Sequence, residues 1–82
     1  MSVSVNPNPA TTWTAVDFTL PGDAVKAIIT ITNTLGVTVS SSELSGHQGQ
    51  KVLDLRHLPN GVYVYSVRCG EYVRTGKLVI SK

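Results

Sequence analysis

The apolar segments of this chain all alternate with a period of two, and none keeps a helical period over ten residues. Alternation of this kind predicts strands, and residues typical of turns follow each segment after about ten positions. Seven strands are expected, at 3–5, 13–20, 24–34, 37–44, 50–58, 62–69 and 72–81. The pattern therefore predicts an all-β fold, a seven-stranded antiparallel Ig-like β-sandwich.

The length and composition suit a single small domain. The chain has 82 residues, of which 15% are charged, below the roughly 25% typical of a soluble domain. We expect residues 1–82 to form one domain, with residues 1–2 a cloning or linker remnant. The formal charge is +2 and the basic residues are scattered, so no nucleic-acid partner is indicated. No apolar run is long enough for a membrane helix, and no signal-peptide pattern opens the chain.

Within the expected strands, alternation assigns residues to the core. The side chains expected to face inward are Val16, Phe18, Leu20, Ala27, Ile29, Ile31, Leu53 and Leu55. The more polar segment 37–44 is expected near a sheet edge. Residues 45–49 are expected to form a loop, and Pro59-Asn60-Gly61 a type I turn followed by Gly61 in the left-handed region.

The last two expected strands form a hairpin whose register can be predicted. Gly70-Glu71 joins them and suits a type II′ turn, since glycine comes first. This register places Tyr65 opposite Gly76, where the ring could cover a residue without a side chain, and Tyr63 opposite Leu78. Cys69 then shares a face with both tyrosines, so a small buried residue is favoured over an activated thiol.

Residues with catalytic potential form no recognisable constellation. Neither His47 nor His57 has a second ligand at metal spacing, and one cysteine cannot build a thiolate zinc site. The run 40–42 of serines lacks the glycine-flanked elbow of a hydrolase nucleophile. The five carboxylates are dispersed singly. We therefore expect a non-catalytic domain with no catalytic, cofactor-binding or metal site and no cofactor.

Trp13 has two interpretations. A tryptophan just after a proline-rich segment could stack on a sugar or a protein partner, or it could cap the end of the sandwich. Capping is the commoner role, and both interpretations stay open at this point.

Four short motifs occur in order along the chain. They are Pro7-Asn8-Pro9-Ala10, Leu35-Gly36, Leu58-Pro59-Asn60-Gly61-Val62-Tyr63 and the closing strand Lys77-Leu78-Val79-Ile80-Ser81-Lys82. In these motifs the chain resembles the type A C-terminal sorting domain of the type IX secretion system of Bacteroidetes. Each motif alone is weak, but the four together span nearly the whole chain.

The resemblance implies a function as a C-terminal export signal on a larger cargo protein. Such a domain is recognised by the outer-membrane translocon from the periplasmic side. A surface transpeptidase then usually removes it and attaches the cargo to the cell surface. The implied route is therefore periplasm in transit, then outer membrane, cell surface or medium.

The same resemblance implies which residues matter. Those implied in translocon recognition are Gly61, Tyr63, Lys77, Leu78, Val79, Ile80, Ser81 and Lys82. Pro7, Asn8, Pro9 and Ala10 correspond to the family's N-terminal motif, close downstream of the usual cleavage point. Cys69 is a departure, because the family has no common need for cysteine.

Other functions stay open at this point. An Ig-like adhesion or carbohydrate-binding module without a role in export is the main alternative, and a hydrolase accessory domain is a weaker one. Open sheet edges pair readily with other chains, so a homodimer or a strand swap is also expected.

Overall fold

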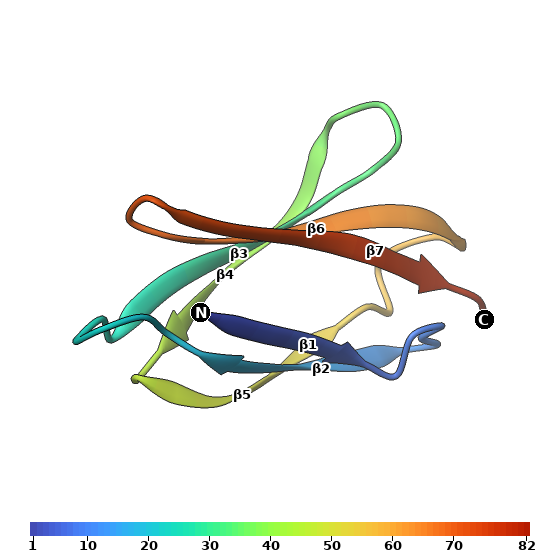
Figure 1. The fold of residues 1–82 in the computed structure, drawn as a ribbon. Helices are drawn as coiled ribbons and strands as arrows, with labels where there is room; N and C mark the ends of the chain where they lie inside the picture. Colours follow the sequence, from blue (N-terminus) through green and yellow to red (C-terminus); the bar gives the residue numbers. More distant parts are fainter.

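Period-two alternation produces strands throughout the chain, as expected. The computed structural model describes all 82 residues and contains seven strands and no helix (Figure 1). The strands are β1 (Ser2–Asn6), β2 (Trp13–Thr19), β3 (Lys26–Thr32), β4 (Thr38–Ser45), β5 (Gln48–Asp54), β6 (Gly61–Cys69) and β7 (Tyr72–Ile80). Except for β5, their ends differ by at most two residues from those expected. No element is a helix able to span a membrane.

The strands form two sheets that pack as the layers of a sandwich. One sheet has the order β1-β2-β5 and the other has the order β4-β3-β6-β7, and all neighbouring strands are antiparallel. Figure 1 shows the three-stranded sheet below the four-stranded one. The prediction of an all-β, Ig-like sandwich is confirmed, and β4 does lie at an edge.

The core lies between the two sheets. Each residue expected to face inward is buried, namely Val16, Phe18, Leu20, Ala27, Ile29, Ile31, Leu53 and Leu55. Cys69 is also buried, as predicted, and its thiol donates a weak hydrogen bond to the Lys26 carbonyl at 3.4 Å.

The hairpin of β6 and β7 has the predicted register. Tyr65 lies opposite Gly76 and Tyr63 opposite Leu78. Gly70 has a φ of 59°, as the first central residue of a type II′ turn requires. A Cβ at Gly76 would overlap the phenol ring of Tyr65, so only glycine leaves room for that ring.

The expected loop at 45–49 is shorter than predicted. Only Gly46 and His47 separate β4 from β5, and these two strands belong to different sheets. Gly46, with a φ of 96°, donates its N–H to the Val25 carbonyl, and the His47 carbonyl accepts from the N–H of Leu20. Because backbone hydrogen bonds hold both residues, a link of two residues is enough for the chain to pass from one sheet to the other.

The expected end of β5 and the turn after it were wrong. The strand ends at Asp54, because the N–H of Leu58 donates to the Leu55 carbonyl and closes a turn there. The Asp54 carboxylate accepts the N–H of Arg56 and supports this turn. Gly61 does have a positive φ, but at 159° it is nearly extended and is the first residue of β6, not a left-handed turn residue.

Candidate recognition site

The segment between β1 and β2 crosses from one sheet to the other. β1 pairs with β2, but Ala10 forms a parallel bridge with Ile80 of β7. The N–H of Ala10 donates to the Val79 carbonyl, and the N–H of Ser81 donates to the Ala10 carbonyl, each at 2.8 Å. The prolines at 7 and 9 lack N–H groups, so this segment cannot simply extend β1.

Asn8 continues the same contact with its side chain. Its amide Nδ2 donates to the Lys77 carbonyl at 2.7 Å, and its Oδ1 accepts the N–H of Val79 at 3.0 Å. The amide group thus presents a donor and an acceptor, as the backbone of a neighbouring strand would. We call residues 8–10 the strap, and the strap covers the outer edge of β7 from Lys77 to Ser81.

Buried groups anchor the strap on both sides. Ala10 is fully buried, and its methyl group joins the core. Just before the strap, the Pro7 carbonyl accepts a hydrogen bond from the hydroxyl of Thr14 at 2.9 Å. Thr14 is the one buried polar residue of the domain, so this bond satisfies a hydroxyl that would otherwise be costly to bury.

The end of the closing strand motif lies against the loop between β5 and β6. The Nζ of Lys82 donates to the carbonyls of Leu58 at 2.6 Å and Arg56 at 3.1 Å. The N–H of Lys82 donates to the side-chain oxygen of Asn60 at 2.9 Å. One residue therefore holds the loop through both its side chain and its backbone.

Tyr63 connects that loop to the core. Its ring is buried, and its hydroxyl donates to the Pro59 carbonyl at 2.6 Å. Since Tyr63 also lies opposite Leu78 in β7, the loop, the strap and β7 meet at one end of the sandwich. In Figure 1 this end is on the right, near the C-terminus.

The remaining motif, Leu35-Gly36, lies at the tip of the β3–β4 hairpin. The Oδ1 of Asn33 accepts the N–H groups of Leu35 and Val37, and Gly36 has a φ of 83°. Leu35 is 85% exposed at this tip. The hairpin projects from the top of the sandwich in Figure 1, and its base shares a groove of about 210 Å³ with residues 58–63.

One surface ion pair lies where β5 ends and the loop between β5 and β6 begins. Arg56 and Asp54 pair at 2.8 Å on the surface, and hydrogen bonds from Arg56 hold the pKa of the Asp54 carboxyl well below its usual range. His57 is exposed in the adjoining turn, and His47 is exposed in the link between the sheets. No three His, Cys, Asp or Glu side chains lie close enough together to hold a metal ion.

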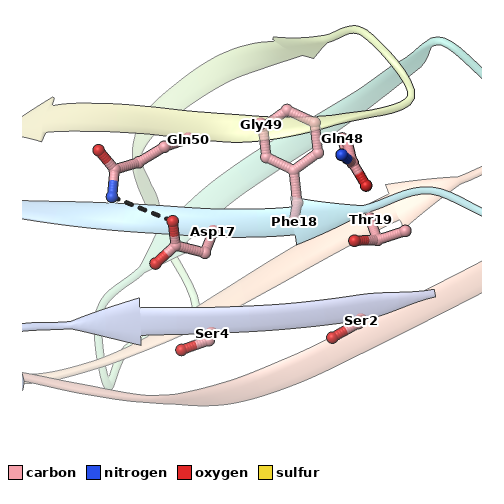
Figure 2. Close-up of a pocket in the computed structure, with 8 residues that line it drawn as sticks. All are labelled: Ser2, Ser4, Asp17, Phe18, Thr19, Gln48, Gly49 and Gln50. Carbon is pink, nitrogen blue, oxygen red and sulfur yellow. Dashed lines mark hydrogen bonds between the residues drawn. The ribbon is translucent and has the colours of Figure 1, made fainter.

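A polar groove lies elsewhere, on the three-stranded sheet. Figure 2 shows it lined by residues of β1, β2 and β5, with the amide of Gln50 donating to the Asp17 carboxylate at 3.0 Å. The groove is open and has a volume of about 470 Å³. It is lined by Ser2 and Thr19, at the ends of β1 and β2 away from the strap, so it is separate from the candidate recognition site.

Of the two interpretations of Trp13, the structure does not favour a cap on the sandwich. The side chain is 48% exposed and does not belong to the core or to the apolar residues packed against it. The strap occupies this end instead, with Ala10 filling the core position.

The sequence did not reveal how the motifs meet. It missed the role of Thr14, although a polar residue on the buried face of β2 signals a need for a partner. It also missed the amide of Asn60 and the carbonyls bound by Lys82. Neither has a local signal, because their partners lie 22 to 26 residues away.

Comparison with protein families gives a match. The model of the family described as secretion system C-terminal sorting domain matches residues 4–81, nearly the whole chain. No curated protein matches the sequence.

Proposed function

Because this chain belongs to the secretion system C-terminal sorting domain family, we propose that the translocon recognises it at β7 and the surfaces that hold β7. The domain is a C-terminal signal for the type IX secretion of cargo proteins. It marks the protein of which it forms the C-terminal part for export across the outer membrane, to the cell surface or the medium. This membership favours the export signal over an adhesion or carbohydrate-binding module.

The observation that carries the proposal is the meeting of three motifs at one end of the sandwich. Asn8 and Ala10 bind β7 from one side, and Lys82 binds the loop that precedes Tyr63. A recognition element needs a fixed shape, and these long-range bonds fix the last strand at a place where chains usually fray.

The recognition residues divide into two groups by exposure. Tyr63, Leu78 and Ile80 are buried and Gly61 is half-buried opposite Ile80, so this group sets the position of β7. Lys77, Ser81 and Lys82 are exposed and Val79 is half-buried, so these residues are the ones a partner can touch.

The partners follow from the same role. We propose that the translocon binds the domain from the periplasmic side and that a surface transpeptidase removes it afterwards. The N-terminal motif Pro7–Ala10 then lies just downstream of the cut. The domain itself acts as a non-catalytic signal in this scheme.

A fusion experiment tests the proposal. Residues 2–82 are joined to a reporter that carries a Sec signal, and the surface fraction of the reporter is measured in a host with the type IX system and in a strain without its translocon. We expect surface delivery only in the first host, and retention in the periplasm after Leu78 to Lys82 are removed. Equal delivery of the truncated fusion, at unchanged expression, would rule out recognition through β7.

The edges of both sheets also bear on the predicted homodimer. β1, β4 and β5 each have one side without a neighbouring strand. We propose that the isolated domain dimerises weakly through such an edge. Light scattering over a wide concentration range tests this, and a monomer at millimolar concentration would contradict it.

A further inference from the structure

The outer edge of β7 is only partly covered by the strap. Antiparallel strands turn the backbone groups of successive residues alternately toward their partner and away from it. In β7 the groups of Lys77, Val79 and Ser81 point away from β6, since these residues bond to the strap. The pairing with β6 is regular from Tyr72 to Ile80, so Val73 and Thr75 present their groups outward as well.

The strap is an incomplete neighbour for this edge. It engages the Lys77 carbonyl, both groups of Val79 and the N–H of Ser81. Two of these four bonds come from the side chain of Asn8 and not from the backbone. The N–H of Lys77, the N–H of Val73 and both groups of Thr75 have no strap residue opposite them, while the Val73 carbonyl accepts a hydrogen bond from the guanidinium of Arg74 at 3.2 Å. A regular strand along the whole edge would pair with all of them.

The charge of this edge indicates what kind of strand would pair with it. β7 carries Arg74 and Lys77, Lys82 follows it, and no acidic side chain occurs from Tyr72 to Lys82. Both Arg74 and Lys77 are exposed. Oppositely charged residues across from them favour pairing, and like charges oppose it.

We propose that the outer edge of β7 is a strand-addition site for an extended acidic segment of the translocon, and that the strap is its resting occupant. The proposal rests on the proposed function and names how the signal is recognised. The chain itself shows that the edge accepts extended backbone, because Ala10 already pairs with Ile80 there. An incoming segment starts at Val73 and Thr75, which the strap leaves uncovered, and then replaces the strap. The backbone bonds that it gains offset the exposure of Ala10, whose methyl group leaves the core.

Proline substitution tests strand addition without removing a bond of the folded domain. Thr75→Pro deletes an N–H that faces away from β6, and edge strands tolerate proline at such positions. Val52→Pro is the matched control. The N–H of Leu55 points toward β2, where it bonds to Thr12, so alternation turns the N–H of Val52 to the open edge of β5.

The variants are compared by thermal melting, by binding of the purified domain to the detergent-solubilised translocon, and by surface delivery of the reporter fusion. We expect Thr75→Pro to weaken binding about tenfold, the effect of about 1.4 kcal/mol, and Val52→Pro to bind as the wild type does. Arg74→Glu should weaken binding and Lys51→Glu should not, which provides a second test if the proline variant melts early.

Equal binding and export for Thr75→Pro, Arg74→Glu and the wild type would overturn the proposal, as would equal losses in each variant and its control. The truncated fusion that lacks Leu78 to Lys82 distinguishes a failure of strand addition from a failure of the proposed function. If its export is blocked while Thr75→Pro behaves normally, only strand addition fails. If the truncated fusion is exported normally, the proposed function itself fails.

Discussion

The side chain of Asn8 accepts a hydrogen bond from the backbone N–H of Val79, across 71 positions of the sequence. The same side chain donates to the Lys77 carbonyl, so its amide group makes the two bonds that the backbone of a neighbouring strand would make. The first and last motifs of the chain therefore form a single structural unit. This unit shows how a motif near the N-terminus comes to lie against β7, the strand at which we propose recognition.

Asn8→Ala should destabilise the domain by about 1 kcal/mol, because it removes two hydrogen bonds that are partly open to solvent. Urea unfolding measures this loss, and hydrogen exchange should show faster exchange of the Val79 amide in particular. Asn6→Ala is the matched control, since the Asn6 side chain bonds only to the nearby hydroxyl of Ser4. Similar losses in both variants would mean that the strap does not hold β7.

Gly76→Ala should destabilise the domain by about 1–3 kcal/mol, because the added methyl group would overlap the ring of Tyr65. Gly49→Ala is the control, with its Cβ 3.4 Å from the ring of Phe18, an ordinary contact distance. Thermal melting compares the two. The substitution Tyr65→Leu should reduce the cost of Gly76→Ala in a double-mutant cycle, and purely additive effects would show that the ring does not cover Gly76.

The ion pair of Asp54 and Arg56 predicts a specific dependence on pH. The pKa of Asp54 is lowered from its ordinary value of 3.8 by hydrogen bonds from the side chain and backbone of Arg56. The ionised carboxylate therefore stabilises the folded state above that ordinary value, and the contribution is lost as the pH falls through the lower folded value.

Asp54→Asn should accordingly melt slightly below the wild type at neutral pH, and the difference should disappear in strong acid. Both side chains are mostly exposed, so the difference should also shrink at high salt. Melting curves across pH and salt measure it. A gap that persists in strong acid would show that the charge of Asp54 is not its cause.

Local chemistry was enough to predict much of the fold. Alternation placed the inward residues of β2 and β3, because one face of each strand must be buried. The Gly70-Glu71 turn fixed the register of Tyr65 against Gly76, because turn type sets the pairing of a hairpin.

The parts that were missed depend on tertiary contacts. The early end of β5 follows from the turn that Leu55 and Leu58 close, and β-strand alternation alone cannot show it. The strap was missed because Asn8 and Ala10 bind partners about 70 residues away, with no periodicity to indicate them. The role of Trp13 stayed open for the same reason, since the strap rather than the indole closes that end of the core.

The most direct test of the account reverses charge on the exposed part of the C-terminal strand without changing the core. The variant Lys77→Glu is compared with Lys51→Glu, which makes the same change of charge at an exposed position of β5. The measurement is the fraction of a fused reporter that reaches the cell surface, at matched expression and with melting curves of both domains. The account predicts that the first variant stays in the periplasm and the second is delivered like the wild type. Equal delivery of the two variants would contradict recognition at β7.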